Sequence, residues 1–234
     1  MASANKTVPM TTPICEFEWV TISGDGKDDL NDVPHYWITC VFDPDRVDKE
    51  NTSEKRAKEH AAFLELLEDF WEEEKPAGSK YEIKGGIKDH KVKTDELDEE
   101  GDPVYESTGK KLIVVKTRTV IENKKKGTSN PKVIKVFNAK GTEIDLGSTL
   151  IGNGSRGRVG LALTTFINKK GSTIISSGLS FYLNTVQLAK LVAYTGQSMD
   201  AIDDDELEED EQFEGAGEMG GIEDESDSAE VPRI

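Results

Sequence analysis

The chain has 234 residues, a hydrophobic fraction of 35% and a formal net charge of −17. The length fits one domain, or one domain with a tail. Globular domains have a hydrophobic fraction of roughly 45–50%, so the low value predicts that part of the chain does not fold. Taken as a whole, so negative a charge argues against a partner such as DNA, which is itself a polyanion.

The first predicted elements are two strands. The segment from Ile14 to Ile22 alternates polar and apolar residues, which places Cys15, Phe17 and Trp19 on one buried face. A loop of Gly, Asp and Asn follows, and the run from His35 to Phe42 is the second strand.

A long amphipathic helix is predicted over about 52–74, inserted after the second strand. Asn51 is the expected N-cap, and Glu54 stands three residues on, which is the spacing of a capping box. The helix ends before Pro76. Its apolar residues recur at three and four positions, which favours packing against a sheet: Ala57, Ala61, Leu64, Leu67, Phe70 and Trp71.

The rest of the ordered chain is predicted to be strands. Gly78–Thr108 is a polar, acidic excursion that we interpret as a loose hairpin. The runs Lys111–Ile121, Val133–Asn138, Ser155–Ile167 and Ser172–Val186 follow, separated by joints rich in Lys, Gly and Asn. At least six short strands with one long helix favour a small, mainly β barrel.

The charge is distributed unevenly along the chain. Residues 198–234 hold 16 acidic residues and one basic residue, a net charge of −15. Residues 1–106 have a net charge of −14, whereas residues 107–190 have 15 basic and 3 acidic residues, a net charge of +12. A charge run is often only a solvated surface. A folded unit of +12 is better explained by a polyanionic partner that neutralises it.

The period-two faces place basic and aromatic residues together on the side opposite the core. In the strand from Ser155, Val159, Leu161 and Leu163 share the core face, and Arg156 and Arg158 the other. Arg and Lys meet phosphates, and exposed rings stack on bases without a sequence code, as binding of single-stranded nucleic acid requires. The candidate DNA-binding residues are Lys111, Lys116, Arg118, Lys124, Lys125, Lys126, Lys135, Phe137, Arg156, Arg158 and Tyr182.

A plainer explanation stays open for some of these residues. Phe137 and Tyr182 could pack in the core, as could Phe166. Lys124–Lys126 could be only a soluble turn between two strands.

Other function classes lack their motifs. The sequence has no GxxxxGK[ST], HExxH or GxSxG, so we do not expect an enzyme. The three His residues and the two cysteines have no metal-ligand spacing, so neither a metal nor a cofactor is expected. Cys15 and Cys40 are expected to be buried thiols in a reducing compartment. The N-terminus has no signal-peptide pattern, and no apolar run is long enough to cross a membrane.

An ordered series of segments resembles a known family. Val136–Gly141, Leu150–Ser155, the basic strand after it and Leu183–Leu188, followed by an acidic tail, look like the single-stranded DNA-binding proteins of T-seven-type podophages. The resemblance covers roughly residues 132–194 and the tail. The chain departs from the family pattern at its end, since it finishes in Ile234 where the family tail usually finishes in an aromatic residue.

The resemblance implies an OB fold with an inserted helix over residues 1–197, and a disordered acidic tail over 198–234. It implies binding of single-stranded DNA without sequence specificity during phage replication, recombination and repair, in the cytoplasm of the infected cell, with promotion of annealing. It also implies a homodimer and a tail that binds the phage DNA polymerase and helicase-primase. The candidate tail residues are Asp203, Asp204, Asp205, Glu206, Glu208, Glu209, Asp210, Phe213 and Ile234.

The tail also suggests a mechanism. A segment with so many acidic residues and so little apolar content cannot offset its ordering entropy, so it is predicted to be disordered. The tail would compete with DNA for the basic module, residues 107–190, and DNA binding would expose it. The tail could also serve only to keep the chain soluble. Two other functions stay open: an acidic interaction or chaperone-like protein without a nucleic-acid role, and a nuclease or nucleotide-processing enzyme.

Overall fold

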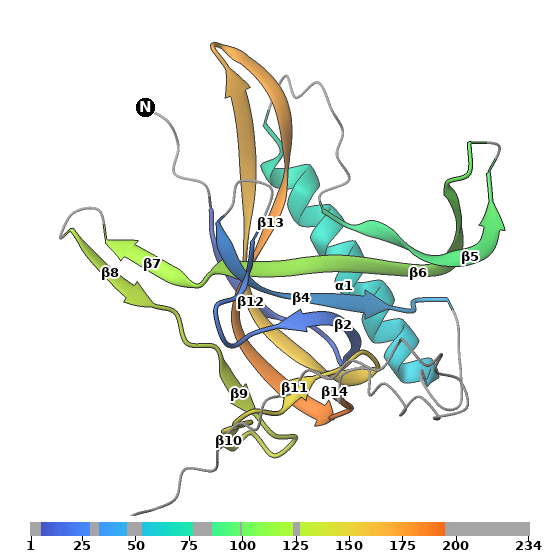
Figure 1. Cartoon of the computed structure of the whole chain (residues 1–234). Helices are drawn as coiled ribbons and strands as arrows, with labels where there is room; N and C mark the ends of the chain where they lie inside the picture. Colours follow the sequence, from blue (N-terminus) through green and yellow to red (C-terminus); the bar gives the residue numbers. More distant parts are fainter. Residues whose placement is uncertain are drawn as a thin grey trace, which may run out of the picture. The chain divides into compact units, whose positions relative to one another are not determined.

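The computed structural model describes residues 6–28, 33–45, 53–76, 86–98, 100–123 and 127–194. These residues lie within one compact unit that spans Met1–Thr195 (Figure 1). Its elements, in chain order, are β1 (Val8–Thr11), β2 (Cys15–Thr21), β3 (Lys27–Asp28), β4 (Pro34–Phe42), α1 (Glu54–Glu74), β5 (Lys88–Leu97), β6 (Pro103–Arg118), β7 (Val120–Asn123), β8 (Thr128–Pro131), β9 (Lys135–Phe137), β10 (Glu143–Ile144), β11 (Leu150–Ile151), β12 (Ser155–Lys170), β13 (Thr173–Lys190) and β14 (Ala193–Tyr194).

One strongly bent sheet forms the framework. Its strand order is β10-β9-β13-β12-β2-β4-β6-β5, with β1 added beside β12 and β3 beside β4. Strand β6 also contacts β13, so the strands β2, β4, β6, β13 and β12 close on one another. The fold is therefore mainly β, a five-stranded barrel of OB type with a long helix inserted between β4 and β6, as the sequence predicts.

The barrel interior takes one face of each of these strands. Alternate residues of a strand point to opposite faces, so every second residue of the strand lies in the core, and these residues are mostly apolar. Burial is complete or nearly so on all five strands, which makes this core the main source of stability. The apolar side chains of these five strands with an exposed fraction of 1% or less are Cys15, Phe17, Ile38, Cys40, Phe42, Ile113, Val115, Val159, Leu161, Leu163, Leu183 and Val186.

The two cysteines are buried free thiols, as predicted. Burial raises the pKa of the Cys40 thiol well above its usual value, with a further contribution from the neighbouring Cys15. Cys40 is therefore held as a protonated, apolar core residue.

Helix α1 packs one face against the barrel, but its start differs from the prediction. Ser53 is the N-cap, and its hydroxyl accepts a hydrogen bond from the Arg56 N–H at 3.3 Å. The expected N-cap, Asn51, was wrong because the capping hydroxyl lies two residues later. The predicted buried position Ala61 is exposed, since the apolar stripe runs through its neighbours His60 and Phe63.

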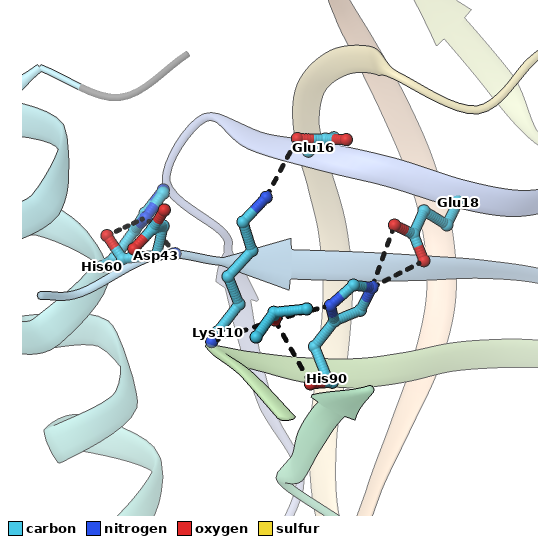
Figure 2. A network of polar contacts seen from close by, with 7 residues as sticks. Glu16, Glu18, Asp43, His60, His90 and Lys110 are labelled. Atoms are coloured by element: carbon cyan, nitrogen blue, oxygen red, sulfur yellow. Dashed lines mark hydrogen bonds and ion pairs between the residues drawn. The ribbon is translucent and has the colours of Figure 1, made fainter. Parts of the chain in front are cut away.

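His60 joins the helix to the residue before β2 and the residue after β4. Its Nδ1 accepts from the Asp43 N–H at 2.9 Å (Figure 2). Its Nε2 donates to the Ile14 carbonyl oxygen at 2.8 Å. Its ring also meets Phe42 edge to face, and Phe63 stacks on Phe42 at 5.3 Å between centroids. The helix is thus fixed by both packing and hydrogen bonds.

Several strand boundaries differ from the prediction. The strand expected over 111–121 is the last part of the longer β6, and β7 begins a separate hairpin with β8 after Thr119. The loose hairpin expected over 78–108 contains an ordered β5–β6 pair. Within the described residues, no helix is long and apolar enough to span a membrane.

Trp19 is the largest departure from the sequence pattern. Period two placed it on the buried face with Cys15 and Phe17, but its side chain is 67% exposed. The pairing of β2 with β4 shifts register between Glu18 and Thr21, so a bulge interrupts the alternation at this point. The prediction was wrong because a single extra residue moves the following side chains to other faces.

Two adjacent leucines of α1 test the role of this packing. Leu67 is fully buried, whereas Leu66 is 49% exposed. We expect Leu67→Ala to lower the free energy of unfolding by about 2–5 kcal/mol, because it removes buried methyl groups and leaves a cavity. Leu66→Ala, the matched control, should change it by less than about 0.5 kcal/mol. Denaturant titration measures both, and equal effects would show that α1 does not pack as described.

Candidate nucleic-acid interface

A groove lies where β6 meets β13. Its volume is about 640 Å³. Three of the predicted DNA-binding residues line it together, namely Lys116 and Arg118 of β6 and Tyr182 of β13. We call it the basic groove; its other lining residues are His35, Gly86, Lys88, Val114, Thr117, Val120, Ile121, Glu122, Phe166, Leu179, Ser180 and Phe181.

Strand register explains why these side chains meet. Residues directly opposite each other in an antiparallel pair point to the same face. Trp37 of β4 lies opposite Lys116, and His35 lies opposite Arg118. Because Ile38 and Val115 occupy the inner face, all four of these side chains are on the outer face.

Tyr182 provides an aromatic surface on the other wall. Its neighbours Phe181 and Leu183 are buried, so alternation turns Tyr182 outward, where it is 49% exposed. It lies opposite Ala162 of β12, a small residue that leaves the ring uncovered from that side. Tyr182 is therefore an accessible ring beside two cations, and the alternative of core packing does not hold for it.

Trp37 was missed by the sequence analysis. Its ring is partly exposed, and the Lys27 ammonium lies 5.1 Å from the ring centroid, within the range of a cation–π contact. The period-two pattern of Pro34–Phe42 contains the signal, because Trp37 has the parity opposite to the core residues Ile38 and Cys40.

A second group of predicted residues lies on the outer face of β9, β13 and β12. Arg158 is opposite Gln187, and Gln187 is opposite Phe137 on the parallel strand β9. Lys135 shares this face and forms an ion pair with Glu143 at 2.8 Å. We call Lys135, Phe137 and Arg158 the outer patch. Of these, Arg158 and Lys135 are exposed and Phe137 is half-buried.

The remaining predicted residues are placed differently. Arg156 is partly buried beside Glu16, Asp43 and Lys110. Lys111 forms a short ion pair with Asp89 across β5 and β6, and it does not line the basic groove. Lys124, Lys125 and Lys126 lie outside the described residues, between the paired strands β7 and β8. The tail candidates Asp203–Asp205, Glu206, Glu208–Asp210, Phe213 and Ile234 also lie outside them.

A polar network holds the start of the β5–β6 hairpin against β2. His90 is buried, and its Nε2 lies 3.1 Å and 3.3 Å from the two carboxylate oxygens of Glu18 (Figure 2). Its Nδ1 lies 2.8 Å from the Thr108 hydroxyl, and the Lys110 ammonium is 3.8 Å from Glu16. Because Lys88 is two residues before His90, this network also fixes a lysine at the wall of the basic groove.

The site offers cations and rings. Within the described parts of the chain, no three His, Cys, Asp or Glu side chains are placed to hold a metal ion. The arrangement of Lys, Arg, Tyr and Trp side chains on the outside of a barrel suits an extended anion that carries flat rings.

Solved structures similar to the chain were found, although no family model and no curated protein matches it. One is gp2.5, a single-stranded DNA-binding protein encoded by bacteriophage T7, with 16% identity and a TM-score of 0.47 over 83% of this chain and 98% of that one. Another is a C-terminal truncation of the single-stranded DNA-binding protein of bacteriophage Enc34, with 15% identity and a TM-score of 0.49 over 78% and 85%.

A third is the Enc34 protein in complex with single-stranded DNA, with 13% identity and a TM-score of 0.43 over 80% of this chain and 89% of that one. All three are single-stranded DNA-binding proteins of phages. Their identities are below 25% and their TM-scores below 0.5, so a function must be argued from the side chains of this chain.

The His90 network gives a test of how the hairpin is held. Thr108→Val keeps the shape of the side chain and removes the hydroxyl that bonds His90. A hydrogen bond contributes about 0.5–1.5 kcal/mol, so amide exchange along β5 should be faster by about 2- to 13-fold. Thr94→Val, farther along β5, is the control and should leave exchange near His90 unchanged. If the amides of β5 exchange at the same rate in wild type and in Thr108→Val, the bond between His90 and Thr108 does not hold the hairpin.

Proposed function

We propose that the chain binds single-stranded DNA without sequence specificity, through the basic groove and the outer patch. The observation that carries this proposal is the basic groove itself, in which Lys116, Arg118 and the exposed ring of Tyr182 line one cavity. Cations would meet the phosphates, and the ring would stack on a base, a contact of about 1–3 kcal/mol.

The charge of the chain supports a polyanionic ligand. Residues 107–190 have a net charge of +12, and they include β6, β9, β12 and β13, which supply the groove and the patch. A chaperone-like or purely protein-binding role does not by itself require this concentration of positive charge on one segment.

The finer role that we propose is in phage DNA replication, recombination and repair within the infected cell. The chain would protect and organise single strands and promote annealing, without catalytic activity. Its acidic tail would recruit the phage DNA polymerase and helicase-primase, and the chain would act as a homodimer. The sequence resemblance supports these partners and the dimer, and the −15 charge of residues 198–234 supports the tail.

The first test is a salt titration of binding to oligo-dT. Affinity should fall linearly with salt on logarithmic axes, with a slope of about −0.7 for each phosphate contacted by a cation. Lys116→Ala with Arg118→Ala should weaken binding and make the slope shallower by about 1.4. Arg156→Ala with Arg158→Ala, in the same assay, measures the contribution of β12.

Lys111→Ala is the control, because this lysine is also on β6 but is paired with Asp89 outside the groove. It should leave the slope unchanged. Absence of oligo-dT binding by wild type at low salt would contradict the proposed function, and an unchanged slope in the Lys116, Arg118 variant would remove the groove from it.

The second test concerns the tail. If residues 198–234 compete with DNA for the basic module, a chain ending at Gln197 should bind oligo-dT more tightly than the full chain at low salt. The difference should shrink as salt is raised, because both attractions are screened. A tail with its acidic residues replaced by Asn and Gln is the control for length, and it should behave like the truncated chain. Equal affinity of full and truncated chains would contradict competition.

A further inference from the structure

Trp19 occupies a backbone position that its residue type does not favour. Its φ is +50°, in the left-handed region, and no other described residue besides glycine has a positive φ. Bulky residues are rare in this region, and the strain costs energy that the surrounding structure has to offset. Trp19 lies at the bulge between Glu18 and Thr21, where a common bulge type has glycine at the left-handed position.

The indole side chain gains little from folding there. It is 67% exposed, more than any other aromatic residue described. A tryptophan normally stabilises a protein by burying a large apolar surface, and this one leaves most of that surface in water. The strained backbone and the exposed ring are each unfavourable for folding. The packing of the barrel explains neither of them.

The neighbouring loop holds the backbone of Trp19 in place. The Trp19 N–H donates to the Asn153 Oδ1 at 2.9 Å, and the Gly154 N–H donates to the Phe17 carbonyl oxygen at 3.0 Å. Both bonds come from the loop that leads into β12, the strand of Arg156 and Arg158. These bonds therefore hold the backbone at Trp19 next to the beginning of β12, a strand that carries basic residues.

The carboxylates beside Trp19 on β2 both have partner side chains. The two nearest carboxylates on β2 are Glu18, which meets His90 at 3.1 Å, and Glu16, which meets Lys110 at 3.8 Å. Asn153 precedes Arg156 by three residues, across the turn that opens β12, so their Cα atoms are at most about 10 Å apart. Arg156 and Arg158 are thus within a few nucleotides of a base placed on the Trp19 ring.

We infer that Trp19 is a stacking platform for a nucleobase of bound single-stranded DNA. This inference rests on the proposed function and extends it, because it adds a contact on β2, beyond the basic groove. The bulge turns the ring outward, and Asn153 keeps the strained backbone in that conformation before DNA arrives, so less ordering is needed on binding.

Two apolar substitutions test the ring itself. Trp19→Leu and Trp19→Phe leave the same strained backbone and differ in the presence of an aromatic face. Trp19→Leu should weaken oligo-dT binding by about 5- to 150-fold, the equivalent of one stacked base. Trp19→Phe should retain most of the affinity. Neither should change the salt slope, because stacking releases no counterions.

A third variant separates binding from stability. Asn tolerates the left-handed region, so Trp19→Asn should have a Tm equal to or above that of wild type while binding as weakly as Trp19→Leu. If the role of Trp19 were only structural, the Trp19→Asn substitution would instead lower the Tm. Tyr105→Ala, which removes another exposed aromatic residue from the acidic β5–β6 hairpin, is the control and should bind like wild type.

The outcomes distinguish this inference from the proposed function. Wild type that binds with a steep salt slope, with Trp19→Leu equal to it, overturns the role of Trp19 and leaves the function standing. Equal weakening of Trp19→Leu and Trp19→Phe also overturns it, since the ring face would then not be what DNA contacts. Wild type that does not bind oligo-dT overturns both.

Discussion

Burial of one face of each barrel strand is the constraint on which the rest of this structure depends. Ile38, Ile113 and Leu183 are fully enclosed, and their alternate neighbours are therefore directed outward. The positions of Lys116, Tyr182 and Arg158 on the surface follow from this packing. The outward side chains share their backbone with the buried ones. The core packing that fixes the strand therefore also fixes the positions from which the surface side chains extend.

Closure of the barrel then brings together residues that are far apart in the chain. Lys116 and Tyr182 belong to strands that do not follow one another, and they line one groove because β6 meets β13. The His90 network acts at the same place, because it holds the start of β5 and with it Lys88. Polar contacts and core packing thus cooperate in shaping a groove where cationic and aromatic side chains meet aliphatic and small polar ones.

The bulge in β2 shows how a local exception to alternation can serve a surface. Regular pairing would have buried Trp19 beside Phe17, and the register shift instead leaves its ring in solvent. The hydrogen bond that the Trp19 N–H donates to the Asn153 Oδ1 stabilises that arrangement. Strain, exposure and a dedicated hydrogen bond at one residue are more simply explained by ligand contact than by folding.

Net charge alone would argue against the polyanionic partner proposed above. The value of −17 combines −14 on residues 1–106 and −15 on residues 198–234 with a +12 segment that supplies most of the proposed binding surface. Electrostatic attraction depends on the charges within about a Debye length of the ligand, so the local value governs the choice of partner.

The sequence by itself determined the fold class, the inserted helix, the buried thiols and the outward faces of β12 and β13, because these follow from local periodicity. It also determined the location of the basic segment, since charge can be counted along the chain. Only the tertiary structure decided that Lys116, Arg118 and Tyr182 share a groove while Lys111 pairs with Asp89, because that depends on barrel closure and register. It also decided the exposure of Trp19, because the bulge depends on how β2 pairs with β4 and cannot be recognised from the polar and apolar pattern of β2 alone.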